Sequence, residues 1–412
     1  MIKKAVLLLS VLLFFCSCEE QPLQRPLLEY AMNNPAQSGS RYPNFYQDDS
    51  GKMYMSWLTN IEEEIFALQY STYQNGRWTV PKTVQINMNF FVNWADFPSV
   101  IGFEGTELAS HHLRKVVGGP YAYNVELSFF DPADGGSWGD PVKVHQDTTA
   151  TEHGFVSLEP MNENKVLAVW LDGRMTADRA DDEYSDTSKS MMFRSAEISR
   201  SGEITNREVI DPTVCDCCQT DLARTEEGFV AVYRGRSSEE IRDIKISRYS
   251  TETGGWSEPV AVHDDNWQIM ACPVNGPSVV ANGNNVAVAW FTAEGDNPRI
   301  MLARSSDGGR TFNEPILLNE QEYRVLGRID LVLSDDGSIY AIWMQEFEGM
   351  GYVMMREVQP DGSLSDPQTV GITDASRSSG FPQIALIEES LIFAWTQTEP
   401  ILKVRTAKVE LN

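Results

Sequence analysis

Arginines are the first residues in this sequence that could bind a charged ligand. A guanidinium grips a carboxylate through two parallel hydrogen bonds, so arginines that converge on one place favour an anionic ligand. The candidates flank extended apolar segments and are Arg41, Arg114, Arg174, Arg234, Arg236 and Arg328, together with His153. We predict that they bind an acidic sugar or another small anion. For any single arginine, a salt bridge between neighbouring loops is the alternative interpretation.

Carboxylates in similar positions could carry out acid–base chemistry. The candidates are Asp96, Glu152, Asp172 and Asp330. Glycoside hydrolysis uses such a pair, because one carboxyl protonates the leaving oxygen while the other acts as base or nucleophile. A glycosidic bond is therefore the expected target if the protein is an enzyme, and the sequence alone leaves catalysis open.

Four of the six cysteines lie outside the N-terminal segment, at Cys215, Cys217, Cys218 and Cys272. In an oxidising compartment such cysteines form disulfides by default, and we predict a bridge between the two segments that contain them. The alternative is a soft-metal site for copper or zinc, with help from His111, His112 or His153. Neither interpretation requires a cofactor for the fold, and a redox role is a further alternative.

An internal repeat determines how these residues are positioned. An apolar strand that ends in an aromatic residue or a histidine recurs about every 50 to 65 residues. Its last residues are Trp57, His111, Trp170, Tyr233, Trp290, Trp343 and Trp395. One strand precedes each copy and two follow, which is typical of a propeller blade. We predict an all-β fold, a single β-propeller of four-stranded blades, with seven blades and six as the alternative.

The propeller explains why residues far apart in the sequence could meet. The first strand of each blade lines the central channel, and its start opens on the same face as the end of the second strand. All the candidate residues above lie at one of these two points. The sequence therefore predicts that function is located at one mouth of the channel.

The N-terminal residues predict export. Lys3 and Lys4 precede an apolar run over residues 5–15, which is too short to span a bilayer as a mature helix. With Cys18 behind it, the run resembles a bacterial lipoprotein signal over residues 1–17, and ordinary secretion is the alternative. We expect acylation of Cys18 and a location in the cell envelope, on the outer membrane or the cell surface.

The remaining chain divides into two parts. We predict a tether and closing strand over residues 18–35, in which Pro26–Met32 supplies the fourth strand of the last blade, and a propeller over residues 36–412. The closing strand would remove an exposed sheet edge. The net charge of −26 argues against nucleic acid and anionic lipid as partners, because both require a basic face. We expect a monomer that contacts the membrane through its lipid alone.

Residues 305–312, Ser-Ser-Asp-Gly-Gly-Arg-Thr-Phe, resemble the Asp-box of the sialidase (neuraminidase, BNR-repeat) superfamily. Degenerate copies occur at residues 71–78, 131–138 and 250–256. The segments CDCCQT, YRGRS, EIRDI and CPVNGP further resemble a bacterial sialidase-like subgroup. The resemblance implies a glycan-facing protein and, if it is an enzyme, a glycoside hydrolase of the exo-α-sialidase type.

The resemblance carries over to part of the site. Arg41 stands where the family has an arginine that binds the sugar carboxylate, and Arg328 with Arg234 or Arg236 is nearest to the other two. The acid–base aspartate of the family is missing from residues 58–61, and sialidases have six blades. Three hypotheses follow: an acidic-glycan propeller that is enzymatic or lectin-like, a metal or redox protein of the envelope, and a protein-binding scaffold.

Overall fold

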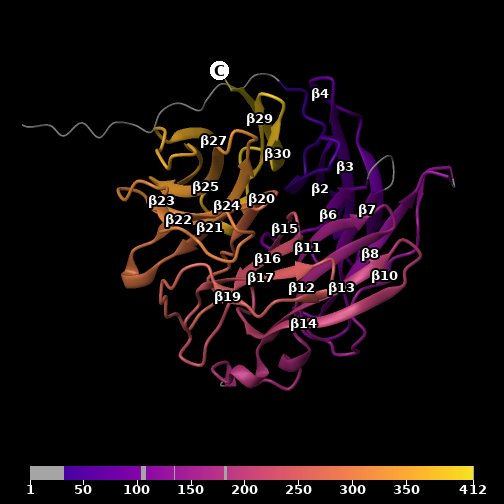
Figure 1. Cartoon of the computed structure of the whole chain (residues 1–412). Helices are drawn as coiled ribbons and strands as arrows, with labels where there is room; N and C mark the ends of the chain where they lie inside the picture. The colour runs from indigo at the N-terminus through magenta and orange to yellow at the C-terminus, as the bar shows by residue number, and fades with distance from the viewer. Residues whose placement is uncertain (1–31, 104–107, 134, 181–182, 412) are drawn as a thin grey trace, which may run out of the picture.

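The computed structural model describes residues 32–103, 108–133, 135–180 and 183–411. The predicted signal, Cys18 and most of the predicted tether lie outside these residues. Seven antiparallel sheets follow one another along the chain and form a ring around a channel (Figure 1). The colours run once around this ring, so each sheet contacts the sheets before and after it in sequence. We call the sheets blades 1 to 7.

The first four blades use strands β1 to β19. Blade 1 contains β1 (Ser40–Gln47), β2 (Met53–Glu62), β3 (Ile65–Gln74), β4 (Arg77–Trp78) and β5 (Lys82–Asn87). Blade 2 contains β6 (Ser99–Gly102), β7 (Leu108–Lys115), β8 (Tyr123–Asp131), β9 (Ser137–Trp138) and β10 (Val142–Lys143). Blade 3 contains β11 (His153–Asn162), β12 (Lys165–Asp172), β13 (Met191–Ser199) and β14 (Ile204–Val214). Blade 4 contains β15 (Asp221–Arg224), β16 (Gly228–Arg234), β17 (Ile244–Ser250), β18 (Gly255–Trp256) and β19 (Val260–Ala261).

The last three blades use strands β20 to β30. Blade 5 contains β20 (Ser278–Asn282), β21 (Asn285–Thr292), β22 (Arg299–Ser305) and β23 (Ile316–Leu317). Blade 6 contains β24 (Arg324–Leu333), β25 (Ile339–Phe347), β26 (Met350–Val358) and β27 (Gln368–Asp374). Blade 7 contains β28 (Gln383–Ile387), β29 (Ser390–Gln397) and β30 (Lys403–Glu410). Short 3-10 helices in the loops are η1 (Arg174–Thr176), η3 (Thr187–Lys189), η4 (Glu294–Asp296) and η5 (Arg377–Ser379).

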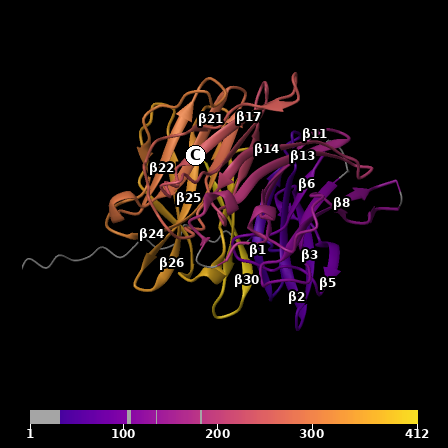
Figure 2. The ribbon, with the colours of Figure 1, turned by 90° about the horizontal axis from the view of Figure 1, so that it is seen from below.

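The prediction of seven blades is confirmed, and the alternative of six is wrong. Within the described residues blade 7 has three strands, and the strand predicted to complete it, Pro26–Met32, lies almost wholly outside them. The ring nevertheless closes between its ends, since the Asn34 side chain donates to the carbonyl of Val404 at 2.7 Å. Blade 1 and blade 7 also share an apolar cluster that includes Trp57 and Ile392. Figures 1 and 2 both show the indigo and yellow strands side by side.

The recurring strand ends are core residues, as the repeat predicts. They lie on β2, β7, β12, β16, β21, β25 and β29, the second strand of each blade. Trp57, Trp290 and Trp343 are completely buried, and Trp395 is only 5% exposed. Their apolar clusters reach from one blade into the next, so burial of these large rings joins blades as well as strands.

The full Asp-box forms a turn on the periphery, between β22 and β23. Asp307 accepts hydrogen bonds from the backbone N–H groups of Arg310 and Thr311, both at 2.9 Å. Gly309 has φ 78°, and a Cβ there would meet Ile246 of blade 4 at 2.7 Å. Phe312 packs into the cluster shared by blades 4 and 5. The motif therefore stabilises the fold and is remote from the channel. None of the helices in the described ranges is long and apolar enough to cross a membrane.

Candidate functional site

Irregular backbone at the start of three inner strands shapes one mouth of the channel. Tyr42 on β1, Phe155 on β11 and Arg328 on β24 have positive φ values of 57°, 54° and 58°. Each lies where the pairing register with the second strand shifts, between Arg41 and Asn44 in the case of β1. Such bulges turn side chains away from the regular alternation, and bulky residues adopt positive φ only where the surroundings enforce it. Three of the inner strands therefore carry strained backbone at this mouth.

Arg328 lies at the centre of the mouth against an aromatic ring. Its guanidinium carbon is 4.9 Å from the centre of the Trp94 ring, and that of Arg377 is 5.8 Å from the same ring. The Arg328 Nη1 donates to Ser379 Oγ at 2.7 Å and to the carbonyl of Gly380 at 3.2 Å. Burial and the charge of Arg377 lower the pKa of Arg328 to about 10, so it remains a cation at neutral pH.

Arg41 and Tyr42 join this group from blade 1. The Arg41 guanidinium carbon is 6.0 Å from the Tyr42 ring, and a Cβ on Gly380 would lie 2.9 Å from that ring. The carbonyl of Gly380 also accepts a hydrogen bond from Arg328, which lies against Trp94. Tyr42 and Gly380 therefore connect Arg41 with Arg328 and Trp94. We call Arg41, Tyr42, Trp94, Arg328 and Arg377 the arginine–aromatic site. Within the described part of the chain, none of its three arginines has a carboxylate within salt-bridge distance.

The other predicted arginines are engaged elsewhere. Arg114 pairs with Glu126 at 3.3 Å, and Arg174 pairs with Asp172 at 2.6 Å. Arg234 is 1% exposed and donates to the carbonyls of Asn275, Arg242 and Phe291. Arg114 thus pairs across two strands of one blade, Arg174 pairs with a residue two positions away, and Arg234 binds backbone carbonyls. The six predicted arginines therefore do not share one volume, and of them only Arg41 and Arg328 lie in the arginine–aromatic site.

Arg236 belongs to a buried ionic network. Its guanidinium pairs with Glu240 at 2.6 Å and with Asp216 at 3.3 Å, and Glu240 also binds Arg242 at 2.6 Å. The backbone carbonyl of Tyr184 accepts a further hydrogen bond from Arg236. Asp216, the acidic residue between the cysteines, also pairs with Arg179 at 2.6 Å. This network occupies the residues of EIRDI and CDCC, so those segments hold the loops of blades 3 and 4 together.

Two of the predicted catalytic carboxylates connect blades. Asp96 accepts from the N–H of Phe155 at 2.8 Å, and Asp330 accepts from the N–H of Ile384 at 2.9 Å. Asp221 makes the same kind of contact with Val279 at 2.7 Å. All three aspartates line the channel cavity, which has a volume of about 300 Å³. Burial raises the pKa of Asp96 and of Asp330 to about 7.

Replacing Asp330 by alanine is expected to destabilise the fold by about 2–4 kcal/mol, because the N–H groups of Ile384 and Leu331 lose their acceptor. The pKa of Asp330 is higher in the folded than in the unfolded chain, so its contribution to stability falls as pH rises from about 4 to about 7. The loss caused by Asp330→Ala should therefore be larger at pH 5.5 than at pH 8. Urea unfolding at both values measures it, with the exposed Asp335→Ala as control. Equal losses at the two values would contradict this role.

Asp96 is linked to Glu152 through a buried tyrosine. The hydroxyl of Tyr123 lies 2.7 Å from Asp96 Oδ2 and 2.8 Å from Glu152 Oε1. The Tyr123 hydroxyl can donate only one hydrogen bond. Both contacts are hydrogen bonds if one of the two carboxyls is itself protonated and donates to the hydroxyl oxygen. Burial, together with the charges of Asp96 and Asp216, raises the pKa of Glu152 to about 8, although the hydrogen bond from Tyr123 lowers it. Glu152 is only half-buried, which makes it the accessible proton donor of this group.

Asp172 and His153 meet in a separate network. His145 Nδ1 and His153 Nε2 lie 2.8 Å and 3.0 Å from the same oxygen of Asp147, and the two imidazole rings stack at 3.7 Å. Asp172 lies 3.7 Å from His153 and holds Arg174. Hydrogen bonds from Arg174 and the charge of His153 lower the pKa of Asp172 despite its burial. This network is internally balanced, with acidic and basic groups paired.

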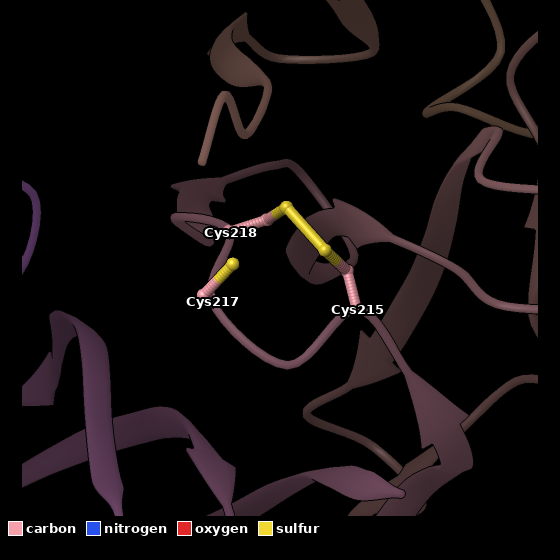
Figure 3. Close-up of side chains that lie close together, drawn as sticks. All are labelled: Cys215, Cys217 and Cys218. Carbon is pink, nitrogen blue, oxygen red and sulfur yellow. A yellow bond between two sulfur atoms is a disulfide. The ribbon is translucent and has the colours of Figure 1, made fainter. Parts of the chain in front are cut away.

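The cysteines form two disulfides, Cys215–Cys218 and Cys217–Cys272. The predicted bridge between the two segments is therefore confirmed. Figure 3 shows the Cys215–Cys218 bond with the sulfur of Cys217 beside it. The two histidines predicted to assist are bound within blade 2: His111 Nδ1 contacts Ser99 Oγ at 2.7 Å and His112 contacts Glu126 at 3.3 Å.

Two groups of described residues have the composition of metal ligands. One is Cys215, Cys217 and Cys218, and the other is His145, Asp147 and His153; the ligand atoms within each lie within 4.8 Å of one another. Cysteine and histidine thus form separate clusters instead of the single cluster that the sequence suggested. The cysteine cluster fits a soft metal once its sulfurs are reduced. In the histidine cluster, Arg174 already pairs with Asp147 and with the neighbouring Asp172, so these carboxylates are engaged.

Comparison with known proteins bears on the fold and its repeats. Residues 227–390, from β16 to the start of β29, match the BNR repeat-like domain. The match covers most of blades 4 to 7 and includes the Asp-box of blade 5. Residues 227–390 thus carry BNR-like repeats, and the chain as a whole folds as a seven-bladed β-propeller. A search of the curated proteins gives no match.

Solved structures similar to this propeller share little sequence with it. A polysaccharide lyase of family PL25, an ulvan lyase, has a TM-score of 0.56 at 11% identity, covering 93% of this chain and 98% of its own. The same lyase bound to -[GlcA(1-4)Rha3S]- gives 0.53 at 12%, with 94% and 98% covered. A Mycobacterium tuberculosis puromycin-hydrolyzing peptidase gives 0.50 at 11%, with 94% and 54% covered. A Trypanosoma rangeli sialidase in complex with sialic acid gives 0.47 at 11%, with 91% and 59% covered.

The repeat places Trp94 and Arg377 at the mouth, just before the first strands of blades 2 and 7, although neither was assigned to the ligand. Other residues of the networks described above were not predicted. Tyr123, His145 and Asp147 lie at the third strand or in loops, away from these two points. No feature of the repeat singles them out.

Proposed function

We propose that this protein binds an acidic glycan at the arginine–aromatic site. The observation that carries the proposal is that, within the described residues, no carboxylate lies within salt-bridge distance of Arg41, Arg328 or Arg377; Asp374 acts on Arg328 only from a longer distance. The chain has 59 acidic and 33 basic residues, so unpaired arginines that lie together are unexpected unless an outside anion completes them. Arg328 is 5% exposed, and a buried unpaired charge is costly without a ligand.

The aromatic ring supports a sugar as the carrier of that anion. Trp94 is half-buried and stacks with Phe381 at 5.8 Å, so the part of its ring that stays exposed offers an apolar edge to a pyranose beside the arginines. An arginine pair beside it supplies bidentate contacts to a carboxylate or a sulfate. The ulvan lyase that shares the fold was solved with a ligand containing GlcA and Rha3S, which are acidic units of this kind.

A glycan array tests the proposal. Wild-type protein should retain sialylated, uronate-containing or sulfated glycans and should not retain their neutral counterparts. Arg377→Ala should lose most of this binding, whereas Arg77→Ala, an exposed arginine on β4, should keep it. Equal retention of neutral and acidic glycans, or equal loss with both variants, would count against the proposal.

Hydrolysis of the bound glycan is the second step of the proposal, and Glu152 is its proton donor. A carboxyl whose pKa is raised to about 8 is protonated at neutral pH, as a general acid must be. Glu152 shares the Tyr123 hydroxyl with Asp96, and Asp96 is two residues from Trp94 along the chain.

If Glu152 is the acid, the rate of sugar release should be constant below pH 8 and fall above it as the carboxyl ionises. Glu152→Gln should lower the rate by about 10²- to 10⁴-fold, because an amide cannot supply the proton. Glu163→Gln, an exposed neighbour in the same blade, is the matched control. If acidic glycosides bind normally but no sugar is released from them, the protein is a lectin and the proposal of an enzyme is wrong.

A soft-metal site at the cysteines is the second candidate function. The three sulfurs that lie within 4.8 Å of one another, with Cys272 bonded to one of them, could bind copper or zinc in the reduced state. Elemental analysis of protein purified under reducing conditions tests it. One equivalent of copper or zinc supports the site, and a metal-free sample with all four thiols free excludes it.

We further propose a lipid-anchored location in the bacterial cell envelope. The support is the sequence pattern that ends at Cys18. Metabolic labelling with a fatty acid should mark the wild-type chain and not Cys18→Ala, which should also leave the membrane fraction. Labelling of both chains would contradict acylation at this residue.

A further inference from the structure

The two disulfides of the cysteine cluster differ in accessibility. Cys272 is exposed, as are its neighbours Met270 and Ala271, whereas Cys215 and Cys218 are 0% and 1% exposed. Cys217 is half-buried and lies between the exposed and the buried cysteines, since it is bonded to Cys272 and adjacent to Cys218. The sulfurs of Cys215, Cys217 and Cys218 lie within 4.8 Å of one another (Figure 3). A solvent-accessible disulfide thus touches a buried one.

The acidic residue within the cysteine segment is neutralised by arginines. Asp216 pairs with Arg179 at 2.6 Å and with Arg236 at 3.3 Å. The N–H of Cys215 donates to the carbonyl of Arg234, which holds the segment against the end of β16. A thiolate, the species that attacks a disulfide, therefore meets no unpaired carboxylate of Asp216.

We propose that these four cysteines form a thiol-exchange site, in which Cys272 receives the attack and Cys217 passes it to the buried Cys215–Cys218 disulfide. The substrate class is a dithiol reductant. One of its thiolates bonds to Cys272 Sγ, the Cys217–Cys272 bond breaks, and Cys217 leaves as a thiolate. Cys217 then attacks Cys215, because bonding to its neighbour Cys218 would close a strained ring. The Cys215–Cys217 bond forms and Cys218 leaves as a thiolate.

The second thiolate of the reductant completes the reaction. It attacks the reductant's own sulfur in the mixed disulfide, so the reductant leaves as a cyclic disulfide and Cys272 is released as a thiolate. Two electrons pass from the dithiol to the protein, one protein disulfide is lost, and Cys218 and Cys272 take up two protons. The product holds its remaining bond between Cys215 and Cys217.

The Cys217–Cys272 bond shares an apolar cluster with the arginine–aromatic site. It joins the loop before β15 to the loop before β20, and Cys217, Val274 and Trp94 all pack against the apolar cluster that contains Phe381. Val274 has φ 58°, which is strained for a β-branched residue and persists only while its surroundings hold it. Exchange at Cys272 should release this strain and loosen the packing around Trp94. This last step, as a control on glycan binding, rests on the function proposed above.

Trapping the intermediate tests the exchange. Wild-type protein is exposed briefly to dithiothreitol, alkylated, and its disulfides are mapped by mass spectrometry. The expected one-disulfide species carries Cys215–Cys217, with label on Cys218 and Cys272. A one-disulfide species that retains Cys215–Cys218 would overturn the transfer. The map needs no glycan, so a failure of the glycan proposal would leave it unaffected.

A double variant tests the rate at which the buried disulfide is reduced. In the double variant Cys217→Ser, Cys272→Ser, the buried disulfide has no relay, and its reduction should be about tenfold slower or more than in wild type. Reduction at the wild-type rate would overturn the proposal, and the trapping experiment remains decisive if the variant does not fold. Faster hydrogen exchange in the peptides containing Trp94 and Phe381 after brief reduction would support the link to the arginine–aromatic site. Unchanged exchange there would refute that link while leaving the thiol chemistry intact.

Discussion

Replacing Arg328 by alanine is expected to weaken binding of an acidic glycan by about 10- to 100-fold, since a charge-assisted pair contributes about 1.5–3 kcal/mol. Arg328 is held in place before any ligand arrives, by Ser379, Gly380 and the face of Trp94. Its guanidinium therefore loses little freedom on binding. Titration calorimetry with a sialylated or uronate-containing oligosaccharide measures the change.

The conservative variant separates charge from geometry. Arg328→Lys keeps the positive charge but loses the planar fork and most of the stacking on Trp94, so it should recover only part of the affinity. Arg77→Ala, on the outer strand β4, should bind like wild type. Full affinity in Arg328→Ala would remove this arginine from the ligand site. Full recovery in Arg328→Lys would reduce its contribution to charge alone.

Replacing Glu240 by alanine is expected to lower the free energy of unfolding by about 3–5 kcal/mol, the usual result of breaking a buried ion pair. Glu240 is 4% exposed and binds the guanidinium groups of Arg236 and Arg242 at 2.6 Å each. Without it, Arg242, which is completely buried, has no carboxylate partner among the described residues. Among carboxylates, Arg236 keeps only the longer contact with Asp216.

The neighbouring Glu239 provides the control for this variant. Glu239 is exposed, and Glu239→Ala should change stability by less than about 0.5 kcal/mol. Chemical denaturation of both variants gives the comparison, and circular dichroism shows whether Glu240→Ala is folded at all. Losses of similar size in the two variants would mean that the buried network contributes nothing special to the fold.

The fold was predictable because one local signal is repeated. Each blade needs a large buried side chain near the end of its second strand, and Trp57, Trp170, Trp290, Trp343 and Trp395 supply it in a regular succession. Seven copies fixed the blade count without any knowledge of contacts between blades. The closing strand was less secure, because its residues carry no such aromatic signal and lie almost wholly outside the described chain.

The site was predictable only as a region. The repeat located the mouth and therefore Arg41 and Arg328, but the partners of an arginine come from other blades. The repeat places Arg234, at the end of a second strand, at the same mouth as Arg328, yet its donors are taken by carbonyls of residues 275 and 291. Asp96 and Asp330 likewise resemble catalytic acids in sequence, while in the structure they accept from amides of the next blade. These differences depend on distances between blades, which no local pattern encodes.

The central claim is that an anion on the ligand, and not the sugar alone, is recognised at the arginine–aromatic site. It is tested most directly by titrating one uronate oligosaccharide against the same oligosaccharide after reduction of its carboxyl groups. The unmodified form should bind at least about tenfold more tightly, and Arg328→Ala should abolish the difference. Equal affinity for the two forms, or a difference that survives in Arg328→Ala, would contradict the account.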